Sequence, residues 1–285
     1  MKASRAAIIG LLGSALACGA SGSKNGFDTE DGGSNTTPSG DGGLGQFDDD
    51  VKSQPVEPVA EVYGHSGQTL YKLNPNTKAV TVVGTFDGCT NVLDIALDGS
   101  SKLYGTTSSA LWAIDKSTGK CTQIAQDSYP NSLSFVPKGT VDANAEALVG
   151  YEGSDYVRID PQSGTKTIIG QIGSGMVSSG DIVSVKNGPT YLTVKSANCD
   201  DCLIEVDPKT GAMVRNWGAV NHSDVFGLAF WAGSIYGFDN QGELFEVKIT
   251  GGNLQTSPIA IPGHPANLKF WGAGSTTSAP VVPTK

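Results

Sequence analysis

Short apolar runs and polar turns alternate along most of the chain, and the same pattern returns several times. The stretches "LYKLNPNTKAVTVVG", "LWAIDKSTGKCTQIA", "YVRIDPQSGTKTIIG" and "LIEVDPKTGAMVRNW" each predict a strand, a tight turn and a second strand. In these turns Asp or Asn is able to hydrogen-bond the backbone two residues on, and a following Pro presets φ in three copies. A fifth copy, "LFEVKITGGN", keeps the glycines without the Asx-Pro pair. No stretch sustains a helical period, so the pattern predicts an all-β fold.

The repeat is longer than a hairpin, because two further apolar strands precede each copy. One has the character of "KLYGTTS" or "SIYGFDN", and the other resembles "NVLDIALDG" or "VFGLAFWAG". The positions that open the turns are Asn74, Asp115, Asp160, Asp207 and Lys248. Four short strands recurring at roughly 40–47 residues are typical of a β-propeller, whereas a two-sheet sandwich needs no self-similarity at this period. We therefore expect one five-bladed propeller with four-stranded blades.

The two ends of the repeat region complement each other. The first copy, from residue 59, starts at its second strand, and "ANLKFWGAG" at 266–274 resembles an innermost strand with no blade after it. Blade one is thus expected to combine strand 266–274 with residues 59–86, which closes the ring and hides its edges. The other four blades are expected at about 91–126, 131–173, 178–220 and 225–262.

The hairpin motif carries a family resemblance. The chain resembles repeat-type propellers with a Tyr-x-Ile-Asp-Pro-x-Thr-Gly hairpin, several of which are bacterial exported lipoproteins. The likeness covers nearly all of residues 59–274 and implies architecture, since propellers host binding, scaffolding and several chemistries.

The N-terminus indicates export. Lys2 and Arg5 precede an apolar run that is too short to span a bilayer, so residues 1–17 read as a signal peptide. The segment before Cys18 resembles the lipobox of bacterial lipoproteins, with Ala15 where that family usually has Leu. This resemblance implies acylation of Cys18, a membrane anchor and an outer-membrane location. Ordinary cleavage after Ala17, giving a soluble secreted protein, is the alternative.

Composition distinguishes a tether from the propeller after the signal peptide. Residues 18–58 are rich in Gly, Ser and Asp and bury too little apolar surface to offset the entropy of ordering, so we expect a disordered acidic tether. The propeller is expected at 59–275, with a flexible tail at 276–285. Acidic residues outnumber basic ones by 28 to 19, and no basic stripe exists, which argues against a nucleic-acid partner.

Four cysteines follow Cys18, and an even number in an exported chain predicts disulfides, with the pairing open. Two cysteines lie close together in "NCDDC", which favours a disulfide within that loop, and the other two are able to pair within blade two. A zinc site of four thiolates or a redox CxxC is an alternative. The four residues are Cys89, Cys121, Cys199 and Cys202.

Polar residues recur just before the innermost strands, at one mouth of the central channel. Carboxylates and amides gathered there are able to coordinate calcium, as in lactonase-type propellers, although no Glu holds these positions. Capping of the blades by hydrogen bonds is the alternative. The candidates are Asn91, Asp94, Asn131, Asp181, His222, Asp224 and His264.

No nucleophile elbow, HExxH or phosphate-binding glycine loop occurs in the sequence. Without a catalytic motif, the sequence favours a membrane-anchored module for binding or scaffolding, with a protein or glycan partner. A metal-assisted hydrolase or lactonase at the channel mouth is the alternative.

Overall fold

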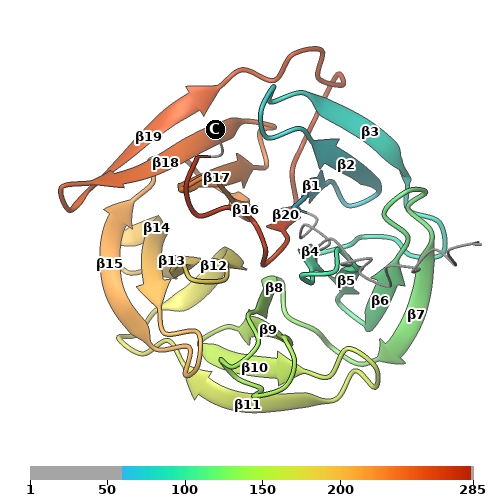
Figure 1. Ribbon diagram of the computed structural model, residues 1–285, viewed down its shortest axis with the longest axis horizontal. Coiled ribbons are helices and arrows are strands. Elements are labelled where there is room, and N and C mark those ends of the chain that lie inside the picture. The colour runs from blue at the N-terminus through green and yellow to red at the C-terminus, as the bar shows by residue number, and fades with distance from the viewer. Residues whose placement is uncertain (1–59, 284–285) are drawn as a thin grey trace, which may run out of the picture. The chain divides into compact units, whose positions relative to one another are not determined.

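The computed structural model describes residues 60–283, which form twenty strands in five four-stranded antiparallel sheets around one centre (Figure 1). Each sheet is a blade, and the predicted five-bladed β-propeller is confirmed. The expected signal peptide, Cys18 and the tether up to residue 58 lie outside the described residues. Within residues 60–283 no helix has the length and hydropathy needed to cross a membrane.

The blades are numbered from the one that holds both ends of the described chain. The innermost strands of blades one to five are β20 (Gly272–Ser275), β4 (Asp94–Leu97), β8 (Leu133–Val136), β12 (Val177–Ser184) and β16 (Val225–Trp231). The second strands are β1 (Val62–His65), β5 (Leu103–Thr107), β9 (Ala147–Glu152), β13 (Thr190–Ser196) and β17 (Ser234–Asp239). The third strands are β2 (Thr69–Leu73), β6 (Ala110–Ile114), β10 (Asp155–Ile159), β14 (Cys199–Val206) and β18 (Leu244–Thr250). The outermost strands are β3 (Val80–Thr85), β7 (Cys121–Gln126), β11 (Lys166–Gln171), β15 (Met213–Ala219) and β19 (Asn253–Ile259).

Blade one is shared by the two ends of the propeller. Strand β20 pairs antiparallel with β1, with Val62 opposite Ser275 and His65 opposite Gly272 (Figure 1). The expected closure of the ring is therefore confirmed. The strand is shorter than the 266–274 expected from its alternating pattern, because the residues before Gly272 form a loop. In that loop the amide of Trp271 donates to the carbonyl of His65 at 2.7 Å.

The repeated turns use the predicted chemistry. The side chain of Asp160 accepts hydrogen bonds from the amides of Gln162 and Ser163, at 2.8 and 3.2 Å. Gly164 comes next with φ +73°, a conformation that glycine adopts without strain. The fifth copy differs, since Lys248 lies inside β18 and its hairpin turns at Gly251 and Gly252.

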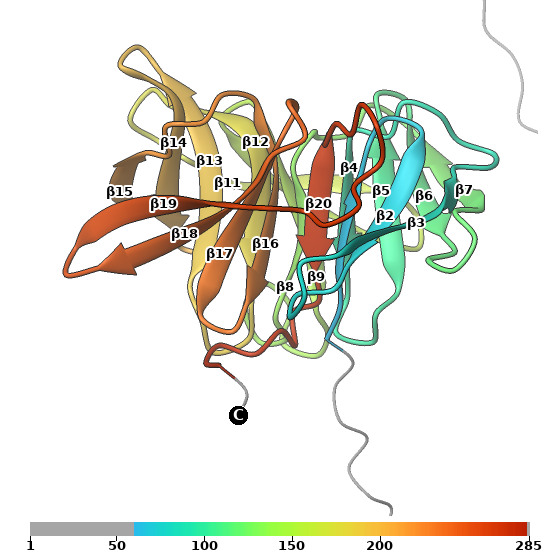
Figure 2. The same ribbon diagram turned by 90° about the horizontal axis from the view of Figure 1, so that it is seen from above.

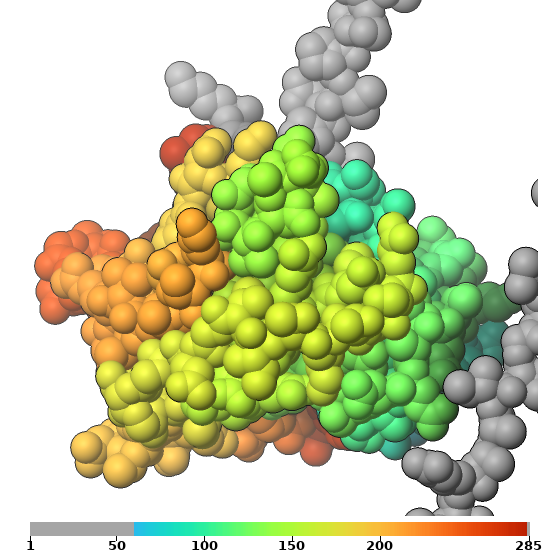
Figure 3. All heavy atoms as spheres, turned by 90° about the horizontal axis from the view of Figure 1, so that it is seen from below, coloured from blue at the N-terminus to red at the C-terminus, as the bar shows by residue number. Residues whose placement is uncertain are grey.

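The core is a ring of apolar clusters, each formed between two neighbouring blades. One cluster joins blades three and four through Val149, Tyr151 and Ile204 among others. Three of the innermost strands, β4, β8 and β20, are buried at every residue. Seen from the side in Figure 3, blade three lies between blades two and four in one continuous surface. Packing between blades, rather than one central core, therefore stabilises the fold.

Both predicted disulfides are present. Cys89, in the loop that leads into blade two, is bonded to Cys121 at the start of β7. Cys199 is bonded to Cys202 within β14, as the spacing in "NCDDC" suggested. All four cysteines form disulfides, so the alternative of a zinc site of four thiolates is wrong. The Cys199–Cys202 bond is also the oxidised form of a redox CxxC, and that alternative stays a prediction.

The segment after β20 packs against the propeller, although the sequence suggested a flexible tail there. Thr276, Thr277 and Ala279 are buried. The carbonyl of Thr277 accepts a hydrogen bond from the amide of Lys186 at 2.8 Å, and Ala279 joins the cluster between blades four and five. This segment lies at the Ser275 end of β20, which is the face where the described chain begins and ends (Figure 2).

Candidate functional site

A pocket of about 270 Å³ lies at the mouth opposite that face. It is lined by Leu93, Asn131, Phe226, Asn240 and Trp271. These residues come from blades one, two, three and five, so the pocket spans the channel mouth. They converge because the chain enters every innermost strand from this face.

The lining combines two aromatic rings with two amides. Phe226, Trp271 and Asn240 are partly exposed, and Asn131 is exposed. The ring of Trp271 lies over Gly67, where an added Cβ would come within 2.7 Å of it. Glycine at position 67 therefore leaves the room that this ring occupies.

Deeper in the channel, Asp94 and Asp181 are completely buried. Asp94 accepts a hydrogen bond from its own neighbour, Ile95, at 2.8 Å and one from the amide of Leu133, in blade three, at 2.7 Å. Asp181 does the same from blade four: it accepts from the amide of Leu228, in blade five, at 2.6 Å. Each carboxylate thus joins its own blade to the next one.

The two carboxyl groups also interact with each other. Burial raises the pKa of both Asp94 and Asp181 well above the usual range, and the negative charge of Asp181 raises the pKa of Asp94 further. The pair therefore holds a proton at pH values where exposed aspartates have lost theirs, as like charges in a shared site require.

His65, at the end of β1, is buried beside this pair. Burial lowers the pKa of His65 to about 4, so the ring is neutral at pH 7. Its Nδ1 lies 2.9 Å from the carbonyl of Ser66, and its Nε2 has no partner and lies 4.0 Å from Asp94 Oδ1. Gly272 lies beside these two atoms: a Cβ at this position would lie 2.4 Å from both Asp94 Oδ1 and His65 Nε2.

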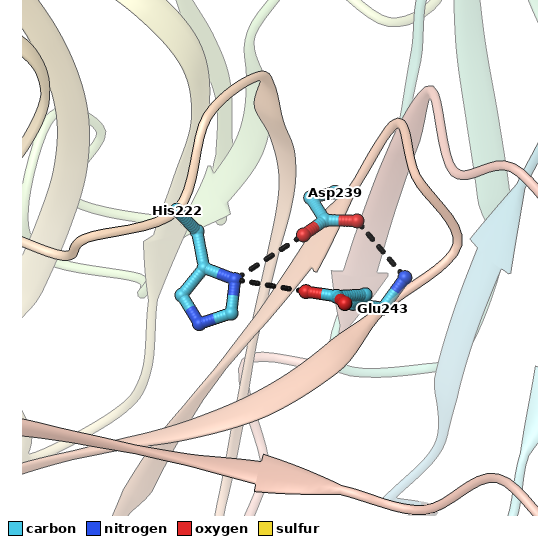
Figure 4. A group of neighbouring side chains, drawn as sticks. All are labelled: His222, Asp239 and Glu243. Atoms are coloured by element: carbon cyan, nitrogen blue, oxygen red, sulfur yellow. Dashed lines mark hydrogen bonds and ion pairs between the residues drawn. The ribbon is translucent and has the colours of Figure 1, made fainter.

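A second group of ionisable side chains lies in blade five. His222, in the loop before β16, directs Nδ1 toward Asp239 at the end of β17 and toward Glu243 in the turn before β18 (Figure 4). The distances from Nδ1 are 3.2 Å to Asp239 Oδ2 and 3.3 Å to Glu243 Oε2. Burial raises the pKa of Asp239. The sequence singled out His222 but missed both of its acidic partners.

The remaining candidates belong to neither group, although the carbonyl of Asp224 accepts a hydrogen bond from the amide of Asn240 at 3.1 Å. Asn91 is exposed, and Asp224 donates its amide to Asp201 Oδ2 at 2.9 Å. His264 is exposed and its Nδ1 faces only the carbonyl of Pro265. In blade three, strand pairing makes Leu133 equivalent to Ile95, which places Ser132 at the level of Asp94.

No protein-family model matches the chain, and a search of curated proteins finds no match. Similar solved structures include hydrazine synthase from Kuenenia stuttgartiensis, with 11% identity over 72% of this chain and a TM-score of 0.40. This chain spans 62% of that synthase chain. An aldose sugar dehydrogenase from Streptomyces coelicolor in its PQQ-bound form has 12% identity, covering 73% of this chain and 79% of its own, with a TM-score of 0.41.

A protein of unknown function from Bacteroides caccae is similar to the same degree, with 10% identity and a TM-score of 0.41. It covers 75% of this chain and 77% of its own length. At these identities and scores the likenesses support no inference about a ligand or a reaction.

Proposed function

We propose that this protein is a binding module of the cell envelope whose mouth pocket takes one sugar ring of a glycan. The observation that carries the proposal is the pairing of Phe226 and Trp271 with Asn131 and Asn240 in one pocket. An aromatic face stacks well on the apolar C–H face of a sugar, and an amide supplies both a donor and an acceptor for its hydroxyls. Binding sites of this kind are concave, mostly apolar and fixed by a few polar groups.

The orientation of the ring supports a role at a membrane surface. His65 and Gly272 are at the pocket end of blade one, and Val62 and Ser275 are at the opposite end. The described chain begins at the latter end, at residue 60 (Figure 2). A protein attached to a membrane through residues before that point has its tethered face opposite to its pocket. The lipid anchor at Cys18 and the outer-membrane location are parts of this proposal.

The alternative of a metal-assisted hydrolase or lactonase receives less support at the channel centre. Such a mechanism needs carboxylates that reach a metal and a substrate. Asp94 and Asp181 are fully buried and accept amide hydrogen bonds from neighbouring blades. These contacts are a structural use of both side chains.

Glycan binding is tested with the purified full chain by affinity electrophoresis against a panel of envelope polysaccharides. We expect retention by at least one of them, and a loss of at least about tenfold in affinity for Trp271→Ala, because burying an aromatic side chain contributes roughly 1.5–3 kcal/mol. Trp271→Phe keeps an aromatic face and should retain most of the binding. Trp217→Phe, on the outermost strand β15, is the control. Retention that is equal for the parent and Trp271→Ala would rule out the pocket.

The anchor is tested by labelling cells with palmitate. The parent should take up label and resist a salt wash from membranes, since several acyl chains give stable anchoring. Cys18→Ser should take up none. If the parent is also unlabelled and appears in the medium, cleavage after Ala17 and secretion replace the lipoprotein.

A further inference from the structure

The group formed by His222, Asp239 and Glu243 has the composition and spacing of a metal site. One ligand atom from each residue, His222 Nδ1 and one carboxylate oxygen from each acid, lies within 4.8 Å of the other two. Two donors about 2.1 Å from one ion lie about 3.4 Å apart in a tetrahedral arrangement. The distances of 3.2 and 3.3 Å from the imidazole nitrogen to the two carboxylates are close to that value.

The two donors nearer the interior are already held in position. Asp239 uses its other oxygen, Oδ1, to accept hydrogen bonds from the amides of Gln241 and Glu243, at 3.0 and 2.9 Å. This leaves Oδ2 directed toward His222 (Figure 4). The imidazole is stacked on Phe245, with ring centroids 3.7 Å apart and planes 6° from parallel. Fixing of ligands by contacts behind them is typical of metal sites.

The third donor is open to solvent. The side chain of Glu243 is 63% exposed, compared with 16% for His222 and 2% for Asp239. An ion thus has a path to the group, and Glu243 is free to adjust its rotamer. Positions of the ion that the protein leaves unfilled face water.

The charges in the group are unbalanced. A neutral imidazole has a single N–H and a protonated one has a single charge, while two carboxylates converge on one nitrogen. Within residues 60–283 no Lys or Arg forms an ion pair with Asp239 or Glu243. A divalent cation would neutralise both carboxylates.

We propose that His222, Asp239 and Glu243 bind a divalent transition-metal ion, with Zn²⁺ as the best-fitting probe. The mixed set of one imidazole nitrogen and two carboxylate oxygens suits zinc, whereas calcium is bound by oxygen ligands alone and in larger number. Asn240, between two residues of the same turn, lines the mouth pocket, so a bound ion would also fix one wall of that pocket.

The test is calorimetric titration of the metal-free full chain with Zn²⁺ and separately with Ca²⁺, without any glycan. We expect one Zn²⁺ bound per chain and a lower affinity for Ca²⁺. Glu243→Gln, at an exposed position that does not endanger folding, should weaken Zn²⁺ binding by at least about tenfold, and His222→Gln should weaken it at least as much. The control is His264→Gln, which removes an exposed histidine from the mouth loops and should leave the affinity unchanged.

Binding that Glu243→Gln leaves unchanged, binding that His264→Gln abolishes, tighter binding of Ca²⁺, or no binding of Zn²⁺ would each overturn the proposal. The titration contains only the metal, so its outcome is separate from that of the glycan experiment.

Discussion

Two sites in this propeller bring two carboxyl groups close together beside a histidine, and they differ in access to water. Asp94 and Asp181 lie at the channel centre with no exposed surface, next to a neutral His65. Asp239 and Glu243 lie at the rim beside His222, and Glu243 is mostly exposed. The central pair relieves its repulsion by holding a proton and by accepting amides from neighbouring blades. The rim pair is open to an ion. Access, rather than residue type, separates a structural carboxylate pair from a candidate binding site.

The largest loss of stability is expected from removing β20, the innermost strand that completes blade one. Deleting residues 266–285 takes away β20 and leaves the backbone groups of its neighbours unpaired, each costing about 1–3 kcal/mol. Because a domain of this kind has only about 5–15 kcal/mol of stability, the truncated protein should lose cooperative unfolding in calorimetry. Deleting only 282–285 keeps β20 and the buried Ala279 and should melt with the parent. A long truncation that melts within a few degrees of the parent would contradict the shared blade.

The two disulfides should contribute differently to the stability of the fold. The larger contribution is expected from the bond that holds the loop leading into blade two. Cys89 and Cys121 are 32 residues apart and Cys199 and Cys202 are 3 apart. Loop entropy predicts losses of about 4 and about 2 kcal/mol when each pair is replaced by serine. Urea unfolding of the two double variants measures this order. Four free thiols in the purified exported protein, detected without reduction, would show that the bonds do not form.

A smaller loss is expected from filling the space beside the central pair. Gly272→Ala would bring a methyl group within 2.4 Å of Asp94 and His65, and overpacking of this kind costs about 1–3 kcal/mol. Gly64→Ala, in the adjacent strand, meets the ring of Phe270 at 3.2 Å and the carbonyl of Gly272 at 3.7 Å, and is the milder control. Equal melting temperatures for the two variants would contradict the close packing of Gly272 against Asp94 and His65.

The smallest expected effect is a change in how the free energy of unfolding depends on pH. Since the pKa values of Asp94 and Asp181 are raised by folding, the native state binds more protons than the unfolded state above about pH 4. Their contribution to stability is complete below that pH and is lost as pH rises toward the folded pKa values. In Asp94→Asn an amide replaces the protonated carboxyl, so the free energy of unfolding of this variant should fall less between pH 4 and 7 than that of the parent.

Asp160→Asn is the control of opposite sign. Hydrogen bonds from the amides of Gln162 and Ser163 hold the pKa of Asp160 below its usual value, so its contribution is lost as pH falls. Chemical unfolding at several pH values measures both slopes. A slope for Asp94→Asn that matches the parent would mean that the central pair carries no shared proton.

The sequence predicted the architecture well because the relevant information is local and repeated. Turn chemistry at Asp160 and its equivalents, the strand alternation and the recurring period together specify blades, and the unmatched segment at 266–274 revealed the closure. The length of β20 was wrong because Leu268 and Phe270 are buried from a loop and imitate an alternating strand.

The sites were harder to predict because they depend on contacts between distant segments. Asp94 and Asp181 were named, but nothing in the sequence indicates that they interact across the channel. Asp239 and Glu243 were missed although a signal existed: "DNQGE" joins a second to a third strand, and such turns lie on the same face as the loop that carries His222. The equivalent turn of blade three, "EGSD", also carries two acids, so the fold was needed to show which pair lies beside a histidine.

The claim that the centre is structural and the mouth binds ligand is tested most directly by one comparison of affinities. The affinity for the polysaccharide that retains the parent most strongly is measured for the parent, Trp271→Ala and Asp94→Asn under identical conditions. The account predicts a loss of at least about tenfold for Trp271→Ala and a change within about twofold for Asp94→Asn. Unchanged affinity in Trp271→Ala, together with lost affinity in a folded Asp94→Asn, would contradict it.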